Sequence, residues 1–199
     1  MAITVEMITQ LREKTGCGMM DCKAALNETA GDFDKAIELL RKKGMAAATK
    51  RAGRSACQGL VDSYIHIGGK IGVLVEVNCE TDFVAKGIDF QAFVKDICMQ
   101  IAASNPQYIN REDVPADIIE REKEVLSAQT KEEGKPAAAI PKIVEGRLQK
   151  FYSEVCLMEQ PFVKDPKVMV KDLLAGLLAK IGEKIVVRRF VRYQLGENS

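Results

Sequence analysis

Alternating apolar and polar residues between positions 59 and 78 constrain the fold more than any other feature of this chain. From Ile71 to Val77 every second residue is isoleucine or valine, and this period of two places the side chains on one face of a β-strand. The preceding segment alternates in a similar way, and the pair Gly68–Gly69 separates the two. Two glycines between alternating segments are typical of a tight turn. The sequence therefore predicts a β-hairpin.

A third strand is predicted over residues 185–195. It must pair with the hairpin, because an isolated strand cannot satisfy its backbone hydrogen-bonding groups. Between the hairpin and this strand, apolar residues recur with helical spacing, most clearly from Phe90 to Ala102. We therefore expect residues 55–199 to form an α+β core domain, with helices packed on a small three-stranded antiparallel sheet. The residues of the third strand expected to face the core are Ile185, Val187, Val191, Tyr193 and Leu195.

Residues 1–54 show only helical periodicities and predict a separate bundle of three helices. The glycine at position 16 allows the chain to turn between the first two helices. The third helix is expected to end at Gly44, because basic residues precede this glycine and glycine suits the left-handed position after a helix. Residues 45–58, which predict an alanine-rich basic helix followed by a looser segment, then link the bundle to the core. So small a bundle is more typical of a docking module than of an enzyme.

Composition argues against several classes of function. The 199 residues carry a formal net charge of +1, so no global field favours binding to nucleic acid or to an anionic membrane. No apolar run is long enough to span a bilayer, and the N-terminal residues lack the pattern of a signal peptide. We expect a cytosolic protein that contacts neither a membrane nor, directly, a nucleic acid.

A catalytic or metal-binding constellation is not recognisable in the sequence. The six cysteines are scattered, and most are expected to be small buried hydrophobic residues. The single histidine, His66, falls on a predicted strand without a convincing nucleophile or base nearby. The glycines at 68–72 join two strands and do not match a phosphate-binding loop. We expect neither an enzyme nor a resident cofactor.

The segment from Asn78 to Lys86 connects the second predicted strand to the next helix and contains a large aromatic residue, Phe83. This side chain could fill the core where the strand meets the helix. It could equally point outward as a contact for another protein, because loops on a rigid scaffold often carry function and aromatic residues dominate interfaces. The pair Met19–Met20 poses the same question, since methionine suits both cores and adaptable contact surfaces. Spacing alone decides neither case.

Four stretches of the chain resemble the bacterial elongation factor Ts family, the nucleotide exchange factors of elongation factor Tu. The first two, LREKTGCGMMDCKAAL and EVNCETDFVA, are the most specific. The single core resembles the short form of the family, which implies a homodimer and a 2:2 complex with the partner. Helix 167–181 and the closing strand are candidate dimer surfaces, although their apolar residues could equally be internal core. The four stretches lie at residues 11–26, 76–85, 100–106 and 144–162.

The resemblance also implies two contact sites. The N-terminal bundle, which would be similar to a ubiquitin-associated (UBA) domain, would dock on the nucleotide-binding domain of the partner. Lys23 matches a family position that contacts the partner. The alternative is that its side chain is only exposed to solvent and contacts nothing. Met19 and Met20 are candidate contacts beside it.

The second implied site is the loop Thr81, Asp82, Phe83 and Val84, which in the family disturbs the magnesium and phosphate site of the partner. GDP phosphates are held by helix N-terminal N–H groups and by Mg²⁺. A rigid wedge such as Phe83 that displaces the surrounding helices would loosen both. Asp82 could hold partner groups that would otherwise keep the site ordered.

Two other classes of protein stay open on the sequence. A general protein-docking module would bind through Met19–Met20 and would tolerate a change at Phe83. An RNA-associated protein would lose affinity steeply with salt, which a net charge of +1 makes hard to sustain. Its candidate contacts would be Lys50, Arg51, Arg54, Arg188, Arg189 and Arg192. For Lys50, Arg51 and Arg54, the alternative is that they form the solvated face of a linker.

Overall fold

The computed structural model of this chain describes residues 3–51 and 53–197, and the side chains of residues 44–51 are not among those described. The chain divides into two compact units. The first comprises Met1–Ser63, Leu74–Ile97 and Lys171–Val191, and the second comprises Tyr64–Val73, Cys98–Val170 and Arg192–Ser199. The predicted division into domains at residue 54 implies that the N-terminal helices can fold on their own, and it stays a prediction.

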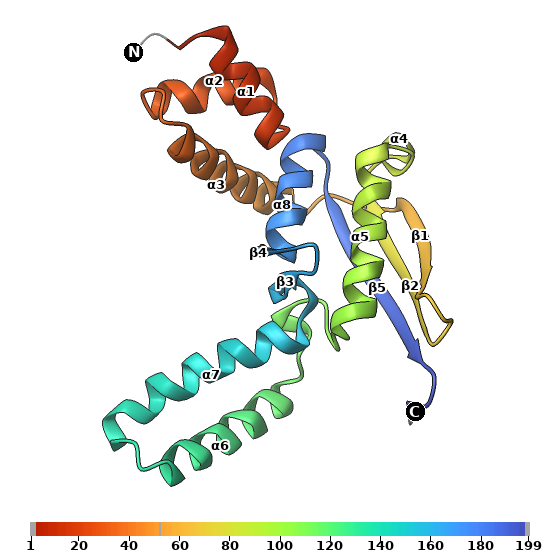
Figure 1. Ribbon diagram of the computed structural model, residues 1–199. Helices are drawn as coiled ribbons and strands as arrows, with labels where there is room; N and C mark the ends of the chain where they lie inside the picture. Colours follow the sequence, from red (N-terminus) through yellow and green to blue (C-terminus); the bar gives the residue numbers. More distant parts are fainter. Residues whose placement is uncertain (1–2, 52, 198–199) are drawn as a thin grey trace. The chain divides into compact units, whose positions relative to one another are not determined.

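The N-terminal part of the first unit consists of helices α1 (Val5–Thr15), α2 (Met19–Glu28) and α3 (Phe33–Arg51) (Figure 1). Helix α1 begins after Thr4, whose Oγ1 accepts a hydrogen bond from Met7 N at 3.3 Å. It ends at Gly16, whose φ of 68° lies in the left-handed region that favours glycine. The three predicted helices are thus confirmed. The buried residues that they share are Ile8, Leu11, Cys17, Cys22, Ala25, Leu26, Ala36 and Leu40.

Helix α3 differs from the prediction, because it continues through Gly44 to Arg51. The expected end at Gly44 is therefore wrong. A glycine inside a helix costs only about 1 kcal/mol relative to alanine, and the alanine-rich segment that follows is a strong helix former. The side chains of Lys50 and Arg51, proposed above as phosphate contacts, lie outside the described residues.

Strands β1 (Gln58–Ile65), β2 (Ile71–Cys79) and β5 (Ile185–Gln194) form the predicted three-stranded antiparallel sheet, in the order β1-β2-β5. The hairpin is closed by a hydrogen bond from His66 N to Ile71 O at 2.9 Å. Because β2 is the central strand, both of its edges are paired. Every second side chain along β2 is buried on one face: Val73, Val75, Val77 and Cys79.

Strand β5 departs from the predicted pattern after its first residues. Ile185 and Val187 are buried, as expected. Arg188 and Arg189 are both exposed, so the alternation shifts by one residue at this pair. Such a shift moves every later side chain to the opposite face. The predicted core residues that are exposed instead are Val191, Tyr193 and Leu195.

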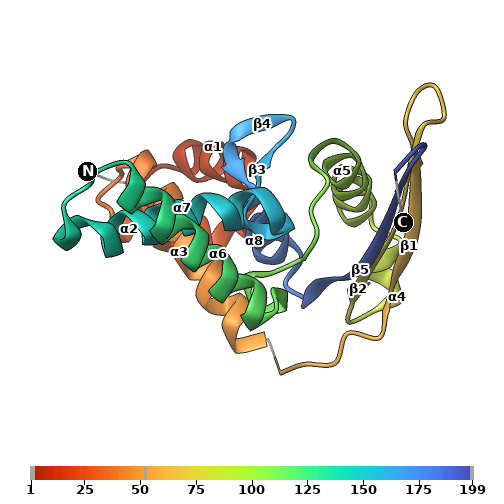
Figure 2. The same cartoon turned by 90° about the horizontal axis from the view of Figure 1, so that it is seen from below.

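Helix α5 (Ile88–Ser104) lies along one face of the sheet (Figures 1 and 2). In the first unit, α8 (Val170–Ile181) contacts the N-terminal helices, because Ala179 packs against their buried cluster and Arg41 forms an ion pair with Asp172. The apolar stripe predicted for α5 is confirmed by its burial. Its members are Phe90, Phe93, Val94, Ile97, Cys98, Ile101 and Ala102.

The second unit contains a pair of helices, α6 (Ala116–Glu132) and α7 (Ile140–Val155), that pack on each other in antiparallel directions (Figure 1). The segment predicted as a loop over residues 160–166 forms most of a small hairpin of β3 (Pro161–Phe162) and β4 (Asp165–Met169). Because β4 continues to Met169, the helix predicted to start at residue 167 starts at Val170.

Within the described residues, no helix has both the length and the apolar character needed to cross a bilayer. The remaining described elements are the short helix α4 (Asp82–Ala85) and the 3-10 helices Arg111–Asp113, Ala137–Ala139 and Leu157–Glu159.

A buried pair of amide side chains connects α5 to the segment after α7. Gln100 and Gln160 are 0% and 2% exposed, and Gln100 Nε2 donates to Gln160 Oε1 at 3.1 Å. Gln100 Oε1 in turn accepts from Val163 N at 2.8 Å. Gln100 and Gln160 belong to two of the stretches that resemble the family, 100–106 and 144–162, and these stretches therefore meet here. The hydrogen bonds between them give the buried amide groups the partners that such groups need.

We predict that Gln100→Leu lowers the free energy of unfolding by about 2–4 kcal/mol, because Val163 N–H and Gln160 Oε1 would both lose their buried partner. Urea denaturation measures this change. The matched control is Gln91→Leu on the exposed side of the same helix, which is expected to change the value by less than about 0.5 kcal/mol. Equal unfolding midpoints for the two variants would contradict the prediction.

Candidate functional site

Phe83 lies on a single helical turn, α4 (Asp82–Ala85), that follows the central strand almost directly. Its side chain is 82% exposed, whereas Phe90, seven positions later, is fully buried. The structure therefore excludes the interpretation of Phe83 as a core residue. A large aromatic ring in solvent beside a paired strand has no packing role of its own, and aromatic residues of this kind are favoured in protein interfaces.

The residues around Phe83 explain why the chain forms a turn here. Thr81 is in the extended conformation at the N-cap, and its Oγ1 accepts a hydrogen bond from Val84 N at 3.4 Å. Threonine is a favoured capping residue, and a carboxylate such as Asp82 in the first turn complements the helix dipole. Thr81 and Val84 are half-buried, while Asp82 is exposed like Phe83. Of the four predicted loop residues, the first and last thus anchor the turn, and the two between them are exposed to solvent.

Asp82 is charged at neutral pH and is not locked in place. Lys86 Nζ lies 2.8 Å from its carboxylate, one turn further along. This hydrogen bond lowers the pKa of the Asp82 carboxyl below its ordinary value. Exposed ion pairs contribute little to stability, so Asp82 can exchange Lys86 for another cation or donor at small cost.

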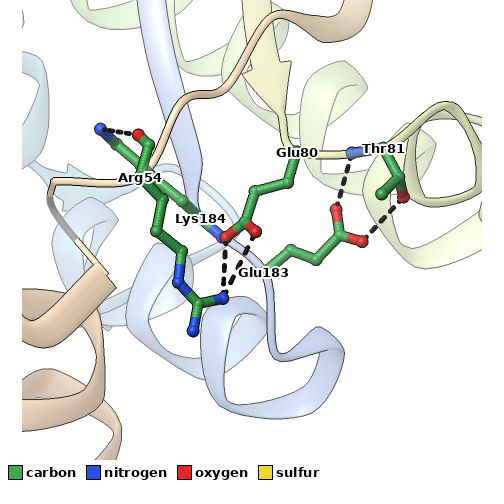
Figure 3. A network of polar contacts seen from close by, with 5 residues as sticks. All are labelled: Arg54, Glu80, Thr81, Glu183 and Lys184. Carbon is green, nitrogen blue, oxygen red and sulfur yellow. Dashed lines mark hydrogen bonds and ion pairs between the residues drawn. The ribbon is translucent and has the colours of Figure 1, made fainter.

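Beneath the turn, Thr81 is held by a carboxylate from a distant part of the sequence (Figure 3). Thr81 N and Thr81 Oγ1 both donate to Glu183, at 3.0 and 2.7 Å. Thr81 O accepts from the thiol of Cys79 at 3.1 Å. Burial raises the pKa of this thiol, and the Glu183 carboxylate raises it further, so the sulfur keeps the proton that it donates.

A second set of contacts lies beside the first (Figure 3). The carboxylate of Glu80 accepts from Lys184 N at 2.6 Å and from Arg54 Nη1 at 3.3 Å. Lys184 Nζ donates to Arg54 O at 2.9 Å. Sequence reasoning did not identify Glu183 or Lys184, because they lie more than a hundred positions from the turn, at separations of 102 and 104 residues from their partners. No local pattern marks such a pair.

Helix α2 carries the other predicted contact residues. Met20 is 75% exposed and Met19 is 38% exposed, while Lys23 is also exposed. Cys22 and Leu26 are fully buried on the side that packs in the bundle. Because residues four apart share a helix face, Met19 and Lys23 lie on one surface. The methionine pair is therefore accessible, and its role in binding stays a prediction.

Several basic residues proposed for RNA contact are already paired with carboxylates. Arg54 lies 3.3 Å from Glu80, and Arg189 lies 2.7 Å from Glu76. Arg192 is paired with an acidic residue in the same way. These pairs reduce the positive charge available to phosphates, which weighs against the RNA interpretation. In the described part of the chain, no group of three histidine, cysteine or acidic side chains is placed to hold a metal ion.

Comparison with known proteins finds one family and a set of similar relatives. The family profile described as Elongation factor TS matches residues 23–197. The Elongation factor Ts of Carboxydothermus hydrogenoformans is 63% identical over 195 residues, which cover 98% of this chain and 90% of the relative. That of Caldanaerobacter subterraneus is 62% identical, with 98% of each covered. The Geobacter sulfurreducens protein of the same name is 60% identical over 197 residues, with 99% and 91% covered.

Proposed function

This chain belongs to the elongation factor Ts family, and we propose on that premise that it is the guanine nucleotide exchange factor of elongation factor Tu. It would bind the GDP-bound partner, displace Mg²⁺ and promote release of GDP, so that GTP can bind during translation elongation. The observation that carries this proposal is the exposed Phe83 ring on the turn after the central strand.

The proposed action of Phe83 is mechanical. A nucleotide diphosphate is held by N–H groups at a helix N-terminus and by Mg²⁺. Insertion of a ring between the elements that surround this site moves the donors and the metal ligands away from the phosphates. Asp82, which is charged and forms an ion pair with a surface lysine, would receive donors of the partner as they move. Thr81 and Val84 would keep the turn attached to the sheet.

Helix α2 would supply the docking contact. Met19 and Met20 present adaptable apolar surface, and Lys23 adds a positive charge beside them. This contact would provide affinity for the nucleotide-binding domain of the partner, while the turn with Phe83 would act on the nucleotide.

No covalent bond is made or broken in this scheme, so the proposed activity is not enzymatic and needs no cofactor. The factor would bind the nucleotide-free partner more tightly than the GDP-bound partner. Linkage then requires GDP to weaken binding of the factor by the same ratio. Excess GTP would complete the exchange. We place this activity in the cytoplasm, where translation takes place.

A prediction for the nucleotide step concerns Phe83→Ala. Release of a fluorescent GDP analogue from elongation factor Tu is measured by stopped flow over a range of factor concentrations. We expect the saturating rate to fall at least about tenfold, as is usual when an aromatic anchor is removed from an interface. The thermal midpoint should not change, because the ring makes little contact with the rest of the chain.

The matched control is Ile67→Ala, which removes a 92% exposed apolar side chain from the hairpin turn and should leave release unchanged. If Phe83→Ala releases GDP as fast as the unmodified factor, the wedge role is wrong. If the unmodified factor accelerates release at no concentration, the exchange function itself is wrong.

A separate prediction concerns docking through Lys23. Lys23→Glu should raise the factor concentration needed for half-maximal release by about tenfold, since reversing a charge at an interface turns attraction into repulsion. The saturating rate should change much less. Lys135→Glu, an equal change of charge on the exposed connection between α6 and α7, serves as the control. A lower saturating rate without a change in the half-maximal concentration would assign Lys23 to the nucleotide step instead.

We also propose that two copies of the chain pair through the outer face of the sheet. In the first unit this face exposes Val61, Leu74 and Val191 to 57%, 47% and 37%, and the three side chains line one shallow hollow. The paired charges of Glu76 and Arg189 border it. An apolar centre with a charged rim is the usual anatomy of an interface. The closing strand is thus preferred over helix 167–181 as the dimer surface.

Sedimentation equilibrium tests this pairing. The unmodified chain is expected to be a dimer at micromolar concentration, and Val191→Glu should weaken association at least about tenfold, because a charge would be buried without a partner. Val125→Glu, at a similarly exposed position on α6, is the control. A monomer at all concentrations, or a dimer unaffected by Val191→Glu, would overturn the proposal.

A further inference from the structure

We infer that Glu183 is a positioning residue for nucleotide exchange: its carboxylate holds the turn that presents Phe83. This inference rests on the function proposed above and adds to it a residue from the loop before β5, far from the turn in sequence. It starts from the two hydrogen bonds that Thr81 donates to Glu183, at 3.0 Å from the backbone N and at 2.7 Å from Oγ1 (Figure 3).

The turn needs external support because it is short. Helix α4 contains only the four residues Asp82–Ala85, and a helix of this length does not persist without outside contacts. The ring of Phe83 is 82% exposed, so packing does not determine its direction. The direction therefore follows from the orientation of the peptide at Thr81, the N-cap residue from which the turn begins.

Two parallel hydrogen bonds to one carboxylate control orientation as well as position. A single bond would leave Thr81 free to rotate about it, whereas two bonds from different atoms of the same residue prevent this rotation. Both residues are half-buried, which limits competition from water. A third contact, from the buried thiol of Cys79 to Thr81 O at 3.1 Å, fixes the remaining polar group of the residue.

Glu183 is itself held by a reciprocal arrangement. Glu183 accepts from the backbone N of Thr81, and Glu80 accepts from the backbone N of Lys184 at 2.6 Å. Each of two neighbouring pairs thus supplies one carboxylate and one N–H to the other. We call these four residues, Glu80, Thr81, Glu183 and Lys184, the reciprocal clamp. It joins the end of β2 to the start of β5 with charge-assisted bonds at the position where the turn departs.

The chemistry of the clamp favours a carboxylate at position 183. Thr81 N can only donate, and Thr81 Oγ1 donates to Glu183 while it accepts from Val84 N. A glutamine would keep the shape of the side chain, but it is neutral and offers one oxygen instead of two. Its NH₂ group can only donate, and its one acceptor on Thr81 is the second lone pair of Oγ1. Glu183→Gln is therefore a nearly isosteric change that replaces two charge-assisted bonds by weaker neutral ones.

The first test measures the turn without any partner. The chain contains no tryptophan, so Phe83→Trp introduces a single tryptophan at the tip, which can be excited at wavelengths that tyrosine does not absorb. Time-resolved anisotropy of this probe should show a nanosecond component whose amplitude at least about doubles on Glu183→Gln, because weaker bonds restrain the turn. Glu38→Gln, the same change of charge at an exposed site on α3, should have no effect. Identical decays for Glu183→Gln and its parent would overturn the inference.

The second test is a double-mutant cycle on GDP release. Glu183→Gln alone should lower the saturating rate about five- to tenfold and change the half-maximal concentration less than about twofold, as expected when charge-assisted bonds are replaced by weaker neutral ones. In the Phe83→Ala background the same change should have almost no further effect. Effects that simply multiply would mean that Glu183 acts independently of Phe83, and the inference would be wrong.

A change at the other end of the two bonds guards against a trivial loss of folding. Thr81→Val removes the hydroxyl donor and should behave like Glu183→Gln, whereas Glu38→Gln on α3 should behave like the unmodified factor. A Thr81→Val variant with the anisotropy and the release rate of the unmodified factor would contradict the clamp. If the unmodified factor fails to release GDP, the proposed function falls, while the anisotropy still decides whether Glu183 holds the turn.

Discussion

The alternate burial of side chains along β2 is the constraint on which the candidate exchange site depends. This strand is paired on both edges, and Val73, Val75, Val77 and Cys79 are buried on one face. A slip of one residue would move all four side chains to the other face, so the register of the strand is strongly specified. The chain leaves the sheet immediately afterwards, and the position of Thr81 is therefore set by the same packing that forms the core.

A rigid support and an exposed ring are complementary requirements. Phe83 lies in solvent, where it adds nothing to the stability of the free protein, and it can act on a partner only if its direction is maintained. The reciprocal clamp maintains this direction by joining the ends of two adjacent strands. Thr81 N donates to Glu183 at 3.0 Å, and Lys184 N donates to Glu80 at 2.6 Å. Pre-organisation of this kind reduces the entropy lost on binding.

Prediction from the sequence succeeded where the signal is local. The hairpin and the apolar stripe of α5 follow from periods of two and of three to four residues, and both are present. It failed at Gly44, where the helix-forming alanines that follow outweighed one glycine. It also failed at β5, where the alternation of buried and exposed residues shifts at two adjacent arginines. Apolar residues occupy both the odd and the even positions of this strand, so the sequence does not show which set is buried.

The sequence by itself determined the α+β class, the β1–β2 hairpin and the apolar stripe of α5, because these depend on neighbours within a few positions, and its resemblance to a family singled out the residues Thr81–Val84. Only the tertiary structure decided that Phe83 is exposed, that Glu183 holds Thr81, and that Gln100 and Gln160 satisfy each other in the interior. The physical reason is the same in each case. Burial and polar pairing depend on which distant segments meet, and a pattern of neighbouring residues does not contain that information.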